Sequence, residues 1–212
     1  MKGLIFDLDG VITDTAEYHF LSWKKLAEDE GIVFTREDNE ALRGVPRRAS
    51  LELVLKGAIR PEADMLAMME RKNNYYLDYV AKMTPANLLE GVHDFLKTAR
   101  ELGFKLGLGS ASKNARLVCE LMGVIDLFDV LGDGYSVVNA KPSPDLFVWV
   151  AGGLGLPPQE CVVFEDAEAG VTAGLAGGFY TVGIGPEERV GKAHRRIAGL
   201  HAVHPKEFLD KA

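Results

Sequence analysis

Short apolar runs alternate with helical patterns along most of the chain. The runs, which are typical of buried strands, lie at residues 4–6, 104–108, 130–132, 161–164 and 180–183. Segments with helical spacing of apolar positions lie at residues 92–102, 114–122, 145–153 and 167–176. The pattern after residue 184 is weaker, with a short helix or loop over 187–198 and a last helix from Pro205. This alternation predicts an α/β core with a doubly wound, mainly parallel sheet.

A long helical stretch interrupts the alternation after the first strand. Residues 15–30 have the spacing of one helix, which Gly31 ends, and helical spacing continues over residues 35–42, 49–56 and 62–82. No strand-like alternation occurs in this stretch. A helical block placed after a first strand predicts a cap domain over residues 15–87, inserted into a core of residues 1–14 and 88–212.

Composition restricts the partners of this protein. The 212 residues are 47% hydrophobic and 26% charged, enough to form a globular core without disulfides. A net charge of −7 argues against nucleic acid or an anionic membrane as partner. Cys119 and Cys161 lie in apolar settings and are expected to be free thiols, which fits a reducing cytoplasm. The first residues form a strand pattern rather than a leader, and no apolar run reaches membrane-spanning length.

Two carboxylates follow the first predicted strand. Asp7 and Asp9 lie on the same side of the extended chain, with Leu8 facing away. Close carboxylates repel each other unless a cation or a shared proton relieves them, and Mg²⁺ suits all-oxygen ligands. A solvated turn with ordinary Asp and Gly residues is an equally good interpretation of this segment alone.

Polar residues also follow the other predicted strands. They are Ser110, Lys141, Glu165 and Asp166, each placed after an apolar run. In a parallel sheet these strand ends meet at one edge, together with Asp7 and Asp9. Carboxylates from two strands can hold Mg²⁺, Ser110 and Lys141 can hold a phosphate, and Asp7 remains as a nucleophile. The combination predicts phosphoryl transfer far more specifically than any one residue.

Several other polar residues are ambiguous. Arg47 and Arg48, in a loop of the helical block, fit either an exposed basic turn or an anion site. His19 is more often a hydrogen-bonded structural residue than a catalyst in such a helix. His201 and His204 are interpreted as structural, and the Gly107-x-Gly109 pair lacks the third glycine of a dinucleotide site.

The motifs together resemble the haloacid dehalogenase superfamily of phosphotransferases, and within it the β-phosphoglucomutase family. The resemblance covers nearly the whole chain. The segments that carry it are residues 6–19, Gly44-Val45-x-Arg47 with Ser50-Leu51, Arg71-Lys72-Asn73, Ser110-Ala111-Ser112-Lys113-Asn114, Lys141-Pro142-x-Pro144-Asp145 and Glu165-Asp166-x-x-Ala169-Gly170. Two positions depart from the pattern: Arg43 replaces a usual Lys, and Pro46 replaces a usual Ser, which stiffens the cap loop.

The resemblance implies a role for each site residue. Asp7 is the expected nucleophile and Asp9 the general acid and base. The implied Mg²⁺ ligands are Asp7, the backbone carbonyl of Asp9, and Asp166, with Glu165 in support. The transferring phosphate is assigned to Ser110, Ala111 and Lys141, and the second phosphate to Arg47, Ser112, Lys113 and Asn114. Gly44, His19, Trp23 and Lys72 are expected on the substrate side of the cap, and Thr15 at its hinge.

The implied reaction interconverts β-glucose 1-phosphate and glucose 6-phosphate. It proceeds through an aspartyl phosphate and β-glucose 1,6-bisphosphate, which also serves as primer. A sugar-phosphate phosphatase of the same superfamily is the main alternative, because it needs no second phosphate site. A third hypothesis is an inactive regulator that binds phosphosugars, but the presence of both Asp7 and Asp9 argues against it. A dehalogenase is disfavoured because Asp9 would have no role in that reaction. The family resemblance also implies a monomer.

Overall fold

The computed structural model describes residues 1–42 and 45–209. It divides into a core unit, Met1–Asp14 with Thr84–Ala212, and a cap unit, Thr15–Met83. The chain therefore returns to the core unit four residues earlier than the predicted boundary after residue 87. Hydrogen bonds to the segment after β1 explain the difference: the Thr13 hydroxyl donates to the Asn87 carbonyl at 2.8 Å, and the Leu89 amide donates to the Ile12 carbonyl at 3.0 Å.

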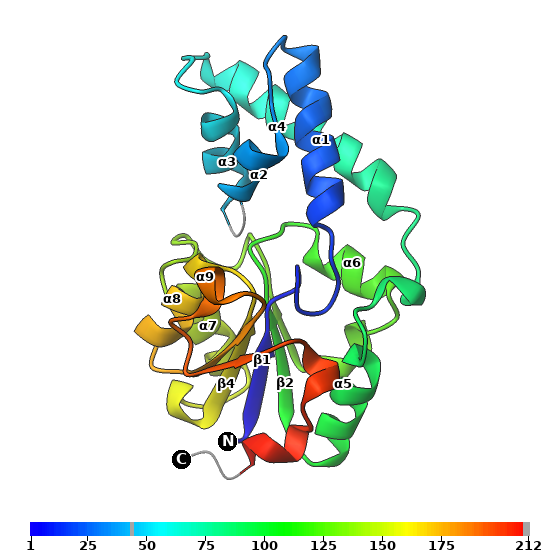
Figure 1. Cartoon of the computed structure of the whole chain (residues 1–212), viewed down its shortest axis with the longest axis vertical. Coiled ribbons are helices and arrows are strands. Elements are labelled where there is room, and N and C mark those ends of the chain that lie inside the picture. Colours follow the sequence, from blue (N-terminus) through cyan, green and yellow to red (C-terminus); the bar gives the residue numbers. More distant parts are fainter. Residues whose placement is uncertain (43–44, 210–212) are drawn as a thin grey trace. The chain divides into compact units, whose positions relative to one another are not determined.

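Six parallel strands form the sheet of the core unit (Figure 1). They are β1 (Gly3–Phe6), β2 (Lys105–Gly109), β3 (Val130–Gly132), β4 (Cys161–Glu165), β5 (Tyr180–Ile184) and β6 (Arg195–Ile197). Their order is β3-β2-β1-β4-β5-β6, so the winding direction reverses between β1 and β4. Ligands of doubly wound sheets bind beyond the carboxyl ends of the strands at this reversal. The predicted fold class is confirmed, and the sheet is parallel throughout its described strands.

Strand β6 is missing from the sequence-based prediction. The prediction gave a short helix or loop over residues 187–198, where the structure has the helix α9 (Glu187–Val190) and then β6. Two of the three residues of β6 are arginines, so the strand has no apolar run by which to recognise it. Backbone pairing with β5 at the edge of the sheet defines it instead.

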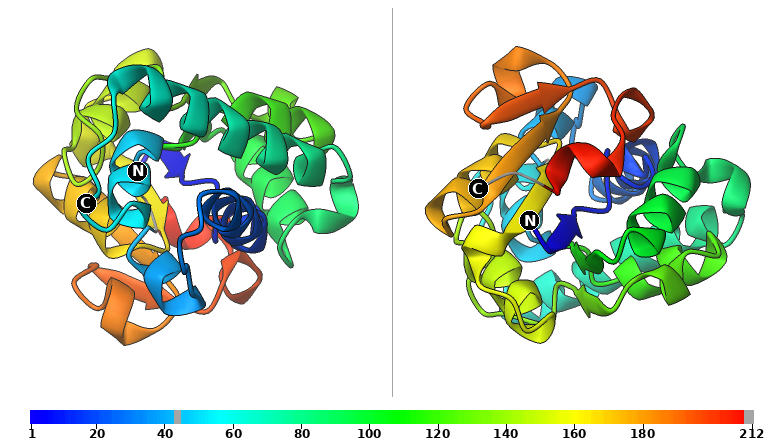
Figure 2. Two further views of the ribbon diagram at one scale, coloured as in Figure 1. Left: turned by 90° about the horizontal axis from the view of Figure 1, so that it is seen from above. Right: turned by 90° about the horizontal axis from the view of Figure 1, so that it is seen from below.

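Helices cover both faces of the sheet. Figures 1 and 2 show α5 (Val92–Glu101) and α6 (Ala115–Leu121) on one face, and α7 (Asp145–Gly153) and α8 (Glu168–Ala176) on the other. The ring of Phe6 in β1 stacks on that of Phe164 in β4 at 4.9 Å and meets Phe95 of α5 edge-on. Five short 3₁₀ turns join these elements: Pro85–Asn87, Ile125–Leu127, Pro158–Glu160, Leu200–Ala202 and Pro205–Phe208. The last of them stands where a helix from Pro205 was predicted.

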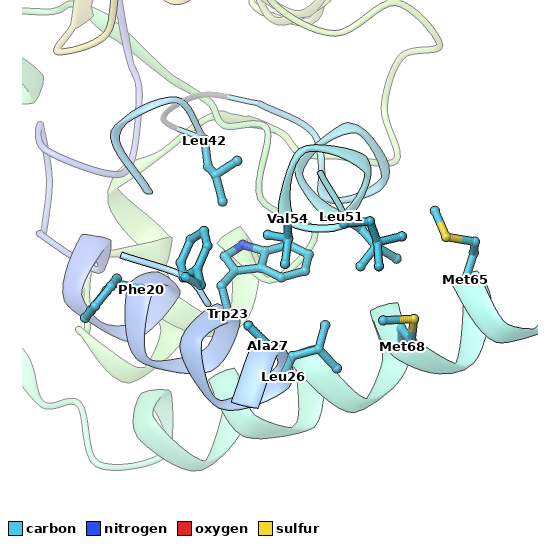
Figure 3. Close-up of a cluster of buried hydrophobic side chains, with 11 residues drawn as sticks. Phe20, Trp23, Leu26, Ala27, Leu42, Leu51, Val54, Met65 and Met68 are labelled. Carbon is cyan, nitrogen blue, oxygen red and sulfur yellow. The ribbon is translucent and has the colours of Figure 1, made fainter. Parts of the chain in front are cut away.

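The cap unit is made of four helices around their own apolar cluster. They are α1 (Ala16–Asp29), α2 (Arg36–Glu40), α3 (Arg47–Val54) and α4 (Glu62–Val80). Buried side chains of these helices and of the segments between them pack together (Figure 3): Phe20, Trp23, Leu26, Ala27, Phe34, Leu42, Leu51, Val54, Leu55, Met65 and Met68. Helix α3 starts two residues before the prediction, because Pro46 takes the position before its first turn. None of the helices in the described residues combines the length and apolarity needed to cross a bilayer.

Candidate active site

Three buried carboxylates converge where β1 and β4 end. Asp7 follows β1, Glu165 is the last residue of β4, and Asp166 follows it. The two strands are in register, and the Asp7 amide donates to the Phe164 carbonyl at 2.9 Å. As a result, Asp7, Glu165 and Asp166 each place a carboxylate oxygen within 4.8 Å of the others. Buried carboxylates this close need a compensating cation or a shared proton, and their hard oxygen donors fit Mg²⁺.

Lys141 supplies one positive charge to this acidic cluster. Its ammonium donates to Asp7 Oδ1 at 2.6 Å and to Glu165 Oε1 at 2.9 Å, and its side chain is 1% exposed. The other oxygen of Glu165 accepts from the Ala167 amide at 2.8 Å. Glu165 is therefore held by two donors of the protein. The three carboxylates outnumber the ammonium, so the cluster retains negative charge for a divalent cation.

Burial and charge act in opposite directions on the two central groups. Burial raises the pKa of Asp7 well above its ordinary value, and the nearby carboxylates of Glu165 and Asp9 raise it further, against the lowering effect of Lys141. Burial alone would lower the pKa of Lys141, but Asp7 and Glu165 together raise it, so the ammonium stays charged. A divalent cation beside Asp7 would favour the ionised carboxylate that a nucleophile requires.

Two glycines make room for the cluster. Gly10, in the turn after β1, has a φ of +77°, and a Cβ there would overlap the carboxyl group of Asp166. At Gly170 of α8, a Cβ would likewise overlap the carboxylate of Glu165. Any side chain at either position would displace a carboxylate of the cluster.

Asp9 lies in the tight turn that follows β1. The Gly10 amide donates to the Thr13 carbonyl at 2.7 Å, which closes this turn, and Asp9 is half-buried. Its carboxylate is near enough to raise the pKa of Asp7. The sequence-based prediction of Asp7 and Asp9 at one site thus corresponds to two neighbouring carboxylates, with Asp7 the deeper of the two.

The loop after β2 holds the next group of predicted residues. Ser110 is buried, and its Oγ accepts from the Ser112 amide at 3.1 Å. The Oγ of Ser112 accepts from the Asn114 amide at 3.2 Å, and the Lys113 ammonium lies 4.6 Å from the centre of the Tyr135 ring. Ala111 lies between the two serines. Asn114 takes the N-cap position of α6, and Ser112 stabilises the turn before it.

The cap unit brings together the other predicted residues. The Lys72 ammonium lies 2.9 Å from His19 Nδ1 and 4.9 Å from the centre of the Trp23 ring. Trp23 is also part of the apolar cluster of the cap. Arg47 opens α3 and donates from Nη2 to Asn73 Oδ1 at 2.8 Å. The four predicted residues and Asn73 come from three helices of one unit.

The remaining predicted positions lie at the edges of the cap unit or outside the described residues. Thr15 is the first residue of the cap unit and the N-cap of α1, and its carbonyl accepts from the His19 amide at 2.9 Å. The hinge role of Thr15 stays a prediction. Gly44 and the unusual Arg43 lie outside the described residues.

We expect His19 to stay neutral at moderately acidic pH. Burial lowers the pKa of His19 well below 6.5, and the positive charges of Lys72 and Arg47 lower it further. Because an ammonium has only donors, His19 Nδ1 accepts from Lys72 and the proton resides on Nε2. NMR of the imidazole, assigned with His19→Gln, should still show this neutral tautomer below about pH 6.5, where an unperturbed histidine becomes protonated.

The same shift predicts the pH dependence of stability. A histidine whose pKa is lowered by folding binds protons better when unfolded, so its contribution is present above about pH 6.5 and is lost as the pH falls below that value. Wild type should therefore lose more stability than His19→Gln between about pH 7 and about pH 5.5 in urea unfolding. Parallel losses in the two proteins would contradict a neutral His19.

One charged residue near the cluster is absent from the sequence-based prediction. The guanidinium of Arg189, in α9, lies 3.6 Å from Asp166 Oδ2. It follows the end of β5, and the rule that polar residues after apolar strands converge would have identified this segment if it had been applied to β5 as well.

The doubly wound core, with its carboxylate cluster and buried lysine at the point of reversal, has the architecture of a phosphoryl-transfer enzyme. A family model described as haloacid dehalogenase-like hydrolase matches residues 1–178, and the chain belongs to this family.

Individual relatives place the chain near sugar-phosphate enzymes. It is 43% identical over 189 residues to a β-phosphoglucomutase of Bacillus subtilis, covering 87% of this chain and 84% of that protein. A crystal structure of β-phosphoglucomutase from Clostridium difficile superposes with a TM-score of 0.95 at 37% identity, over 100% of this chain and 96% of the other. The fructose-1-phosphate phosphatase YqaB of Escherichia coli is 31% identical, covering 86% of this chain and 95% of the phosphatase.

Proposed function

We propose that this protein is a β-phosphoglucomutase, which interconverts β-D-glucose 1-phosphate and D-glucose 6-phosphate. The observation that carries the proposal is the buried contact between Asp7 and Lys141 inside the acidic cluster. A carboxylate attacks a phosphoryl group only when positive charge offsets the negative charge of both groups. Lys141 offers one such charge at 2.6 Å from Asp7. The likeness to the Bacillus subtilis mutase along 87% of the chain favours a mutase over other phosphoryl-transfer enzymes.

Asp7, Asp166 and the backbone carbonyl of Asp9 would hold Mg²⁺, with Glu165 in support. The ion would offset the charge of the transferring phosphoryl group. Asp7 then forms a bond to phosphorus while the bond between phosphorus and the sugar oxygen breaks. Asp9 gives a proton to the departing sugar oxygen and takes one from the attacking hydroxyl. Ser110, the Ala111 amide and Lys141 bind the phosphoryl oxygens.

A mutase must bind its bisphosphate intermediate in two orientations. Phosphorylated Asp7 donates its phosphoryl group to the 6-hydroxyl of β-glucose 1-phosphate, and the 1,6-bisphosphate reverses before its 1-phosphoryl group returns to Asp7. A second phosphate site is therefore required, and we assign it to Arg47, Ser112, Lys113 and Asn114. Thr15 serves as the hinge of the cap, and His19 with Lys72 belongs to the network that forms around the substrate.

Phosphorus NMR of the purified protein tests this proposal. The reaction contains Mg²⁺, β-glucose 1-phosphate and a trace of glucose 1,6-bisphosphate as primer, and a parallel reaction contains the α-anomer. We expect the β-anomer alone to become glucose 6-phosphate, with little free phosphate. Conversion of both anomers would refute the assigned anomer.

A sugar-phosphate phosphatase is the second candidate. The similarity to fructose-1-phosphate phosphatase YqaB favours it, since a phosphatase would use the same acidic cluster and Lys141. Free phosphate as the main product of the NMR experiment would refute the mutase and support the phosphatase.

Arg47 distinguishes the two functions. Arg47→Ala should raise the activation free energy of the mutase reaction by about 1.5–3 kcal/mol, because one charge-assisted phosphate contact is lost. Hydrolysis of a simple aryl phosphate should slow much less. Steady-state rates with both substrates measure the difference.

Arg48 provides the matched control for this variant. It neighbours Arg47, but its guanidinium pairs with Glu62 at 2.6 Å and with Glu52 at 3.0 Å. Arg48→Ala should leave both activities near wild type. Equal losses of mutase and aryl phosphatase activity in Arg47→Ala would refute the second phosphate site.

A further inference from the structure

Arg189 contacts the acidic cluster in a different way from Lys141. The Lys141 ammonium is buried and makes short hydrogen bonds to Asp7 and Glu165. The Arg189 guanidinium is 32% exposed and lies 3.6 Å from Asp166 Oδ2, beyond a normal hydrogen bond. Within the cluster, the ion pair of Arg189 is with Asp166. The guanidinium thus acts on Asp166 through its charge, from the solvent side.

The fold holds the arginine near this position. Arg189 lies in α9, directly beyond the end of β5, which pairs with β4. Gly185, in the connection between β5 and α9, has a φ of +123°, and a Cβ there would lie 3.1 Å from Arg189 Nη2. The arginine side chain therefore folds back over the turn at Gly185, and a larger residue at 185 would crowd it.

From this geometry we infer that Arg189 weakens Mg²⁺ binding at Asp166 and so sets the metal affinity of the site. The inference rests on the metal site of the proposed function. A guanidinium keeps its charge at every accessible pH, so it opposes a divalent cation under all working conditions. It also supplies a positive charge to Asp166 when no ion is bound. Loading the site exchanges this ion pair for metal ligation, which lowers the net gain from binding Mg²⁺.

Titration of Mg²⁺ alone tests the inference without turnover. Isothermal titration calorimetry is carried out on the metal-free full-length protein at low ionic strength. Arg189→Gln should lower the Kd for Mg²⁺ about three- to tenfold, because the repulsion between the guanidinium and the ion disappears. Added KCl should shrink the difference from wild type, since Arg189 is partly exposed and its charge is screened.

Two variants separate charge from shape and from general effects. Arg189→Lys keeps the charge and should bind Mg²⁺ within about twofold of wild type. Arg100→Gln removes the same charge from an arginine of similar exposure, which pairs with Asp129 at 3.0 Å beside the start of β2, and should leave the Kd unchanged. An unchanged or raised Kd in Arg189→Gln, or a Kd in Arg189→Lys as low as in Arg189→Gln, would overturn the inference.

The outcomes for metal affinity and for function are separable. A lowered Kd in Arg189→Gln together with free phosphate as the NMR product would support the role of Arg189 and refute the mutase. Failure of the wild-type protein to bind Mg²⁺ would refute the metal site and this inference with it.

Discussion

Asp7→Asn should abolish formation of the phosphoryl-enzyme and lower turnover by at least about 10³-fold. The amide oxygen can still accept from Lys141, so the fold should be retained, but the nucleophilic carboxylate is lost. Mass spectrometry after incubation with Mg²⁺ and acetyl phosphate measures the phosphoryl group directly. Wild type should gain one phosphoryl group, on the peptide that contains Asp7, and the variant none.

Asp9→Asn is the control for this experiment. It removes a second carboxylate from the same turn, but the acetate that leaves acetyl phosphate needs no general acid. This variant should still gain the phosphoryl group while it turns over glucose 1-phosphate slowly. Phosphorylation of Asp7→Asn would place the nucleophile elsewhere in the chain.

Lys141→Met should destabilise the metal-free protein by about 3–5 kcal/mol near neutral pH, because Asp7 and Glu165 lose their buried partner. Without the ammonium, the pKa of Asp7, which burial already raises, would rise further above its unfolded value. A raised carboxylate pKa favours folding at low pH, and this advantage is lost as the pH rises through the folded pKa. The deficit should therefore grow from about pH 5 to about pH 7.5, and excess Mg²⁺ should reduce it.

Urea unfolding followed by circular dichroism measures this deficit. Lys2→Met is the matched control, because Lys2 forms an exposed pair with Glu160 at 2.9 Å. An exposed ion pair contributes at most about 1 kcal/mol, so this variant should stay close to wild type at every pH. A similar small effect in Lys141→Met would mean that the acidic cluster does not depend on the buried lysine.

Apolar runs identified the fold because its strands are buried. The runs at residues 4–6 and 161–164 correspond to β1 and β4, which are covered by helices on both faces. Strand β6 escaped prediction since its arginines pack at an edge and only backbone pairing makes it a strand. The boundary after residue 87 was displaced for a related reason: hydrogen bonds between Asn87 and Thr13 are tertiary and leave no local signal.

The sequence predicts those residues of the site that directly follow the strands of the sheet. Asp7 and the Glu165-Asp166 pair follow neighbouring parallel strands, so their convergence follows from topology. Which group pairs with which depends on side-chain packing, and the sequence did not indicate that Lys141 would bridge Asp7 and Glu165. Arg189 was missed because the convergence of polar residues after apolar strands was considered for the other strands and not for β5. The roles of the individual residues in substrate binding stay predictions.

The central position of β1 also has a consequence for biosynthesis. This strand leaves the ribosome before its partners β2 and β4, and Gly3 pairs with Lys105 and with Cys161. At about 5–20 residues per second, β4 follows β1 after roughly 10–30 s. The apolar cluster of the cap is complete within Thr15–Met83 and is available much earlier. The apolar cluster of the cap can therefore form before β1 has both of its partners, and β1 is open to chaperones during this interval.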